Sequence, residues 1–243
     1  MSKESTPAPH HNTFTYTFEF ADGSTRTFRI VLASDTLQTL PGERESYPEW
    51  TRLHHRKCTN CPLDEFRHPR CPIAVNLVDV VDFFGERSSF EEVAVKVEAN
   101  EREYRKTTTL QQAISSLIGI YTVTSGCPVM DKLRPMVDTH LPFATPREAI
   151  YRLVSMYLTA QFFRARAGQA PDWRLAGLPA ILDDCRLTNA FLSRRLKSLG
   201  IHDATLNALN ILNVQGELAS LSLETDNLAH WQRIFDQAYC QDG

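Results

Sequence analysis

Aromatic and polar residues alternate near the start of the chain. Every even-numbered residue from 14 to 20 is Phe or Tyr, and the residues between them are Thr or Glu, which is the period of a half-buried β-strand. Apolar residues return at every second position from 28 to 32. A three-residue loop, with Gly23 at the position that needs a positive φ, places both apolar sets on one face of a hairpin. We therefore expect Tyr16 to pair with Phe28.

Helical spacing follows after a polar stretch. Residues 39–50 contain Pro41-Gly42 and Pro48, and such residues are typical of a linker. Apolar residues then recur at helical spacing between 73 and 84, with Pro72 suited to the first helical position and Gly85 to the end. The valines in this stretch leave a strand as the alternative.

A second hairpin is predicted from another alternation. Val93, Val95 and Val97 are separated by single residues, and a turn at Ala99-Asn100 lets Tyr104 return opposite Val95. The two hairpins together predict a small antiparallel sheet of four strands with one helix inserted between them.

The rest of the chain is predicted to be helical. Apolar residues lie on one face of a helix over residues 108–124. Thr145-Pro-Arg-Glu148 is a capping box with proline at the first helical position, and it predicts a helix to about residue 167. The Phe162-Phe163 pair is expected in the core. Three further helices are expected near residues 179–199, 203–221 and 226–239.

These elements predict an α+β protein, a small antiparallel sheet from two hairpins followed by an α-helical bundle. We expect residues 1–12 to be a disordered leader. Residues 13–106 then form the sheet, with a Cys-rich loop at 48–72 and one helix. Residues 107–243 form the bundle, packed with the sheet as one unit. A hydrophobic content of 42% in 243 residues is enough to bury a core.

Charge and hydropathy narrow the class of protein. A formal net charge of −3 excludes a generally basic surface of the kind that coats nucleic acid. The first twelve residues lack the apolar segment of a signal peptide, and no apolar run approaches the length that spans a bilayer. We therefore expect a cytoplasmic protein with no membrane association. In a reducing compartment, clustered cysteines are more often metal ligands or redox groups than disulfides.

The segment from His54 to Cys71 gathers three cysteines and three histidines. Cys58 and Cys61 are separated by two residues, and a turn of that length brings two sulfurs to the spacing of a tetrahedral metal site. Cys127 lies far downstream in Ser-Gly-Cys-Pro. We predict a metal-binding protein of unknown cellular role, in which one site joins the two halves. The predicted ligands are Cys58, Cys61, Cys71 and Cys127.

The ligand set and the metal have alternatives. His68, in a His-x-x-Cys pattern, or His55 could replace Cys127 and leave the loop a self-contained knuckle. Structural zinc is the metal expected of four cysteines, and the protein is then a binding or scaffold module with a possible protein partner on its helical half. An iron–sulfur cluster is the alternative, since Cys followed by Pro occurs among iron–sulfur ligands, and it predicts a redox or sensor protein.

Proline follows three of these cysteines, Cys61, Cys71 and Cys127. Proline suits the first position of a helical turn, so each cysteine would be an N-cap residue. Free N–H groups then point at the sulfur and the helix dipole favours the thiolate. This arrangement predicts lowered pKa values for the three thiols.

Basic residues surround the cysteines and suggest a further alternative, a nucleic-acid-binding module. They could contact phosphates while a metal holds the shape of the loop. Four thiolates around one zinc ion leave a negative site, however, so basic neighbours are expected without any partner, and we favour this explanation. A dithiol redox centre at Cys58 and Cys61 is less favoured, because a third cysteine lies close by. The basic residues are Arg52, Arg56, Lys57, Arg67 and Arg70.

Three runs of the sequence resemble those of a bacterial family. The family consists of uncharacterised bacterial proteins known only as a domain of unknown function, and the resemblance covers most of the chain after the leader. It implies no activity. The runs are His-Arg-Lys-Cys-Thr-Asn-Cys-Pro-Leu-Asp (55–64), Cys-Pro-Ile-Ala-Val-Asn-Leu-Val-Asp (71–79) and Thr-Ser-Gly-Cys-Pro-Val-Met-Asp-Lys-Leu-Arg-Pro-Met (124–136).

Overall fold

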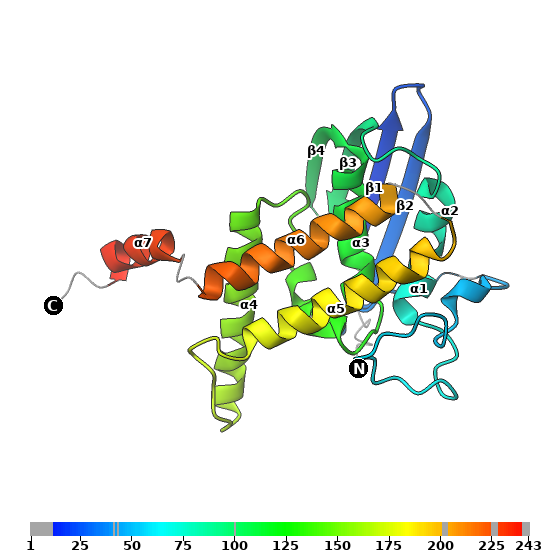
Figure 1. Ribbon diagram of the computed structural model, residues 1–243. Helices are drawn as coiled ribbons and strands as arrows, with labels where there is room; N and C mark the ends of the chain where they lie inside the picture. The colour runs from blue at the N-terminus through cyan, green and yellow to red at the C-terminus, as the bar shows by residue number, and fades with distance from the viewer. Residues whose placement is uncertain are drawn as a thin grey trace, which may run out of the picture.

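An antiparallel sheet begins the fold (Figure 1). The computed structural model describes residues 12–40, 42, 44–99, 101–200, 204–224 and 228–239. The predicted leader lies outside these residues except for Asn12, which starts the first strand. The order across the sheet is β2-β1-β3-β4, so all four predicted strands form. They are β1 (Asn12–Phe20), β2 (Thr25–Leu32), β3 (Glu92–Ala99) and β4 (Arg102–Thr109).

The first hairpin forms as predicted, and the second is displaced by two residues. Tyr16 pairs with Phe28, and Gly23 has a φ of 82°, which glycine adopts without the clash of a Cβ. In the second hairpin, however, Val97 and not Val95 faces Tyr104, so the predicted register is wrong. A displacement of two residues keeps every side chain on the same face. The alternation of the valines therefore could not distinguish the two registers.

One face of the sheet carries the main core. Phe18 of β1 and Phe28 of β2 point into it, and α2 (Val78–Phe84) covers them. The ring of Phe84 lies 5.0 Å from that of Phe18 and 5.4 Å from that of Phe28, measured between centroids. On the opposite face Glu19 is exposed. The period-two pattern thus gives the half-buried sheet that alternation predicts.

The segment with helical spacing is helical, which settles the alternative of a strand. It forms α1 (Pro72–Asn76) and α2, interrupted at Leu77, and Gly85 is the C-cap. Pro72 occupies the first position as predicted. A short 3-10 helix, η1 (Glu49–Thr51), precedes the cysteines.

The helical half forms layers over the sheet. α3 (Leu110–Val123) packs against β3 and β4, α6 (Ala204–Glu224) packs along α3, and α5 (Leu178–Lys197) packs along α6. Figure 1 shows α5 and α6 side by side, with α7 (Ala229–Tyr239) beyond the end of α6. No pattern in the sequence predicted the 3-10 helix η2 (Met130–Val137), which lies between α3 and α4.

The helix α4 (Pro146–Arg166) begins as predicted but buries a different face from the one expected. Thr145 and Glu148 form the capping box. Phe162 and Phe163, expected in the core, are 50% and 59% exposed. The buried stripe reaches Gln161 instead, whose side-chain oxygen accepts a hydrogen bond from the Asp172 N–H at 3.0 Å. Adjacent helical residues point about 100° apart, so the phenylalanines fall beside the stripe.

Two hydrophobic clusters result. The larger joins the sheet to α1, α2, α3, α5 and α6, and the smaller joins α4 to α5 and the end of α6. Leu133 of η2 packs against both clusters. The predicted α+β class is confirmed. In the part of the chain that the structure describes, no helix is long and apolar enough to cross a membrane.

Candidate functional site

A buried arginine of α5 holds the cysteine loop (residues 48–72) against the helical half. Arg195 is 2% exposed. Its Nη1 donates to the carbonyl oxygens of Trp50 at 2.6 Å and Arg52 at 2.7 Å, and its Nη2 donates to that of Leu53 at 3.4 Å. Guanidinium donors match several carbonyls at fixed angles, so Arg195 fixes the path of the loop.

The predicted cysteines lie within electrostatic reach of one another. Burial raises the pKa of the Cys58 thiol to about 12, and negative charge on Cys71, Cys61 or Cys127 would raise it further. The guanidinium of Arg195 acts in the opposite direction and favours the Cys58 thiolate. Burial in turn lowers the pKa of Arg195, and thiolate charge on Cys71, Cys58 or Cys61 would raise it.

The prediction of lowered thiol pKa values is wrong at two of the three positions. Burial raises the pKa of the Cys71 thiol. It outweighs the guanidinium of Arg195 and the helix N-terminal N–H groups of Ala74 and Ile73, which favour the thiolate. Burial likewise raises the pKa of Cys127, against the N–H groups of Met130 and Val129. Desolvation disfavours a thiolate more than one or two amides favour it here.

The prediction of a metal-binding protein is wrong. No group of three or more His, Cys, Asp or Glu side chains in the described residues is placed to hold a metal ion. Neither zinc nor an iron–sulfur cluster therefore has support. The physical reason is that a metal ion binds thiolates, whereas burial raises the pKa values of Cys58, Cys71 and Cys127 and favours their neutral thiols. Within the described ranges, the free cysteines are Cys58, Cys61, Cys71, Cys127 and Cys185.

The alternative histidine ligands have other surroundings. The Nε2 of His55 lies 2.9 Å from Ser198 Oγ at the end of α5, and burial lowers its pKa. His68 is exposed, and its backbone N–H donates to the carbonyl of Asp64. His55 thus belongs to the contact between the loop and α5.

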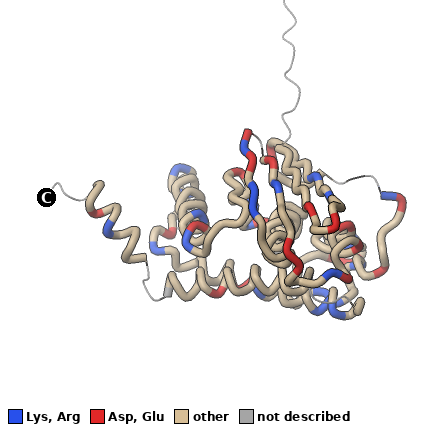
Figure 2. Tube along the Cα trace, turned by 90° about the horizontal axis from the view of Figure 1, so that it is seen from above, with Lys and Arg blue, Asp and Glu red and all other residues tan. Residues whose placement is uncertain are grey.

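Most of the basic residues of the cysteine loop have partners within it. Lys57 Nζ donates to the Leu63 carbonyl at 2.8 Å, and Arg70 Nη1 donates to Thr51 Oγ1 at 2.6 Å. Arg52 lies 3.3 Å from a carboxylate oxygen of Glu49, whereas Arg56 and Arg67 are exposed. Figure 2 shows Lys and Arg interspersed with Asp and Glu over the described chain. Binding of nucleic acid therefore gains no support from this loop.

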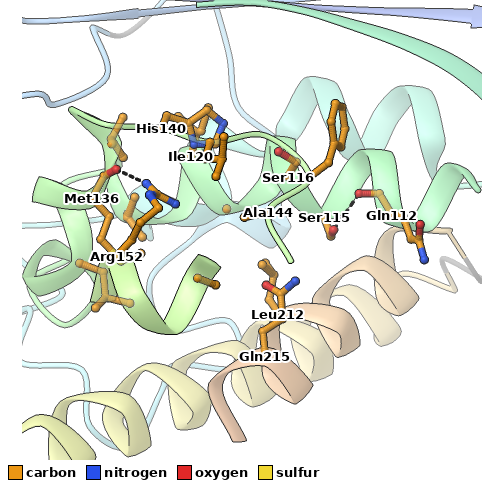
Figure 3. A pocket seen from close by; sticks show the side chains of 17 residues that line it. Gln112, Ser115, Ser116, Ile120, Met136, His140, Ala144, Arg152, Leu212 and Gln215 are labelled. Carbon is orange, nitrogen blue, oxygen red and sulfur yellow. Dashed lines mark hydrogen bonds between the residues drawn. The ribbon is translucent and has the colours of Figure 1, made fainter. Parts of the chain in front are cut away.

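A cavity of about 180 Å³ lies between the two hydrophobic clusters (Figure 3). We call it the α3–α4 cavity. Its walls come from α3, η2, the loop that follows η2, α4 and α6. The lining is mostly apolar, and Arg152 is its one charged residue within the described chain. The apolar lining consists of Gly119, Ile120, Val123, Leu133, Met136, Val137, Leu141, Phe143, Ala144, Ala149 and Leu212, and the polar lining of Gln112, Ser115, Ser116, His140, Arg152 and Gln215.

A hydrogen-bonded chain connects the sheet to one end of the cavity. The hydroxyl of Tyr16 lies 2.7 Å from His140 Nε2 and 2.9 Å from Ser116 Oγ. The His140 ring also meets Phe14 edge to face, with centroids 5.3 Å apart. Burial lowers the pKa of His140 to about 3, with a smaller effect of Arg152 in the same direction. Burial raises the pKa of Tyr16, against the Ser116 hydrogen bond, so both groups are neutral at neutral pH.

Arg152 lies near this end of the cavity (Figure 3). Its Nη2 donates to the Met136 carbonyl at 2.6 Å. Its Nε is buried without a hydrogen-bond partner. Burial lowers the pKa of Arg152, and Tyr104 and Glu148 act in the opposite direction. The site therefore combines an apolar chamber with an incompletely paired cation.

Sequence reasoning missed this cavity. His140 precedes Leu141-Pro142, which is typical of a loop and gives no sign that the hydroxyl of Tyr16 lies against one of its ring nitrogens. Arg152 follows a capping box on a helix that also carries Arg147, Arg164 and Arg166, and nothing local distinguishes it from them. A cavity between two clusters depends on tertiary packing, which the helical period does not report.

Comparisons with known proteins give a family and no function. The profile of a family described as a domain of unknown function (DUF6901) matches residues 14–236, which confirms the predicted resemblance. No similar protein was found among the curated proteins, and no similar structure among the solved ones.

Proposed function

We propose a function from the cavity itself, because the chain belongs to the DUF6901 family of domains of unknown function, which assigns none. The protein binds a small, largely apolar molecule in the α3–α4 cavity. The observation that carries this proposal is the chamber of about 180 Å³ with apolar walls and a few polar groups. Such a combination is characteristic of small-molecule sites.

The size of the cavity limits the ligand. An apolar cavity of about 150 Å³ accepts benzene, so a chamber of about 180 Å³ suits a single ring or a short branched chain. Nucleotides and other large cofactors need considerably more space. The half-buried state of Leu141 and Phe143 indicates that solvent reaches the wall they form.

The pKa values of His140 and Tyr16 favour a binding function over a catalytic one. A general acid or base works best when its pKa lies near the operating pH. Burial holds the pKa of His140 at about 3 and raises that of Tyr16 above its usual range. Neither group exchanges a proton readily near pH 7, so the pair is suited to orienting a ligand and not to proton transfer.

A cavity-filling variant tests the proposal. Saturation-transfer NMR with single-ring compounds that include phenylacetamide and phenylacetate should detect binding to the wild-type protein. Ala144→Leu places an isobutyl group in the chamber, where Figure 3 shows Ala144, and should abolish the signal. A hydrophobic residue just before an N-cap is well tolerated.

Ala160→Leu is the matched control, since the same substitution then falls on an exposed residue of α4. It should leave binding unchanged. Equal binding by the Ala144→Leu protein, with its fold intact by circular dichroism, would place the ligand elsewhere and contradict the proposal. So would the absence of a signal from every compound with the wild-type protein.

A further inference from the structure

The charge of Arg152 is the least satisfied feature of the α3–α4 cavity. Its guanidinium has five N–H donors, and one hydrogen bond, from Nη2 to the Met136 carbonyl at 2.6 Å, is made among the described residues. Within the same residues no salt bridge joins it to a carboxylate, and its Nε is buried without a partner. The donors of Arg152 thus exceed the acceptors that the described residues supply.

The nearest acidic group is already engaged. Glu148 lies one turn before Arg152 on α4, but its carboxylate accepts hydrogen bonds from the Thr145 N–H and hydroxyl, both at 2.8 Å. That carboxylate closes the capping box and fixes the start of the helix. Among the residues that the structure describes, no Asp or Glu lines the cavity. The cavity lining itself therefore supplies no negative partner for Arg152 among the described residues.

The other groups at this end make the cavity a site for one negative charge. Ser116 and His140 are neutral, and the hydrogen bond to Tyr16 occupies the His140 Nε2. A guanidinium keeps its proton even when buried, so Arg152 contributes one positive charge. A monoanion balances it, whereas a phosphate monoester would leave charge uncompensated in an apolar chamber.

From these observations, and resting on the small-molecule function proposed above, we infer that the ligand is a monocarboxylate with a compact apolar body. Its carboxylate accepts hydrogen bonds from Arg152, and its apolar body lies against Ile120, Leu133 and Leu212. Arginine pairs with carboxylates through two parallel hydrogen bonds, and Met136 limits how the guanidinium can rotate. Figure 3 shows Arg152 and Leu212 on different walls of the same space.

Phenylacetate and phenylacetamide separate charge from shape, because they differ at one atom of the head group. In calorimetric titrations of the wild-type protein, phenylacetate should bind about tenfold more tightly or better, which is the effect of one charge-assisted hydrogen-bonded pair. Arg152→Met should remove this preference while the amide still binds. Arg152→Lys should keep part of it, because the charge stays and the two-pronged geometry is lost. Arg164→Met, an exposed position on the same helix, should change nothing.

Each outcome decides between the two proposals. If the acid and the amide bind wild type equally and Ala144→Leu abolishes both, the cavity binds small molecules but the inferred ligand class is wrong. If phenylacetate binds equally to wild type, Arg152→Met and Ala144→Leu, both proposals fail, because the anion then sits elsewhere. Absence of saturable binding of either compound also overturns both.

Discussion

A buried arginine, Arg195, and a half-buried one, Arg152, differ in how their charges are satisfied. Arg195 donates to three backbone carbonyls of the cysteine loop, those of Trp50, Arg52 and Leu53. Arg152 donates to one carbonyl and retains a buried, unpaired Nε. Neither has a carboxylate partner among the described residues. The first arginine completes a closed structure, and the second lines an open chamber.

The difference shows which unusual residues indicate function. The cysteine loop attracts attention in the sequence, yet its buried cation is used to hold the chain together. The α3–α4 cavity has no conspicuous motif, yet its Arg152 makes one hydrogen bond among the described residues and keeps a buried, unpaired Nε. Buried polar groups are normally paired, so an incompletely paired group beside a cavity is the stronger pointer to a ligand.

Arg195→Met should give the largest loss of stability, and it tests the contact between Arg195 and the cysteine loop. Methionine removes the Arg195 donor from three carbonyls. That of Arg52 keeps the His55 N–H at 3.2 Å, whereas those of Trp50 and Leu53 lose the arginine, and a buried acceptor without a partner costs about 1 to 3 kcal/mol. We expect a loss of about 3 to 5 kcal/mol in the free energy of unfolding, measured by urea denaturation. Arg152→Met, without added ligand, should lose about 1 kcal/mol, the value of its one hydrogen bond.

Arg195→Lys refines this test, because it keeps the charge but cannot reach three carbonyls in the same geometry. It should be destabilised nearly as much as Arg195→Met. If the lysine variant were as stable as wild type, charge near the thiols of Cys58 and Cys71, and not the carbonyl contacts, would be what Arg195 contributes. Equal losses for the Arg195→Met and Arg152→Met variants would remove the distinction between the two regions.

The neutral His140 gives a second, smaller effect, on the cavity side. Burial lowers its folded pKa to about 3 from an ordinary value of 6.5. Between those values the unfolded chain binds a proton that the folded protein does not, so the contribution is present above pH 6.5 and is lost as the pH falls. The loss should be about 1.4 kcal/mol per pH unit. Urea denaturation at pH 7 and pH 5 should show it.

His140→Gln isolates this contribution. Glutamine keeps a hydrogen-bonding partner for Tyr16 but does not titrate, so the loss of stability between pH 7 and pH 5 should be smaller in the variant. The other histidines and the carboxylates contribute equally to the pH dependence of both proteins. Their contribution cancels when the change in unfolding free energy of the variant is subtracted from that of wild type. Identical pH dependence in the two proteins would mean that the His140 imidazole is solvated and not enclosed by Phe14 and Tyr16.

Local patterns explain why much of the fold could be predicted. The alternation around Tyr16, the turn at Gly23 and the capping box at Thr145 and Glu148 each depend on residues close in sequence, and all are confirmed. The register of the second hairpin is wrong because a shift of two residues satisfies the same alternation. The prediction that Phe162 lies in the core is wrong because several faces of α4 carry apolar residues, and tertiary packing decides which face is buried.

The site could not be predicted in the same way. Cys127 does lie within electrostatic reach of Cys58, but the sequence does not show that Arg195 enters from a helix far downstream. In sequence, Arg195 resembles its neighbours Arg194 and Lys197, which are exposed. The cavity arises where two clusters meet at Leu133, and no periodicity predicts an imperfect fit between clusters.

Lys57→Met should give the smallest loss of stability. It tests whether a partly exposed cation of the cysteine loop also stabilises the fold. Lys57 donates to the Leu63 carbonyl at 2.8 Å and lies 3.6 Å from a Glu65 carboxylate oxygen. Its side chain is 30% exposed, so the ion pair adds little and the hydrogen bond dominates. We expect a loss of about 1 kcal/mol in the free energy of unfolding, measured by urea denaturation.

Arg67→Met, on an exposed side chain of the same loop, should cost less than about 0.5 kcal/mol. Equal costs would show that the positive charge itself, acting on the thiols, stabilises the loop.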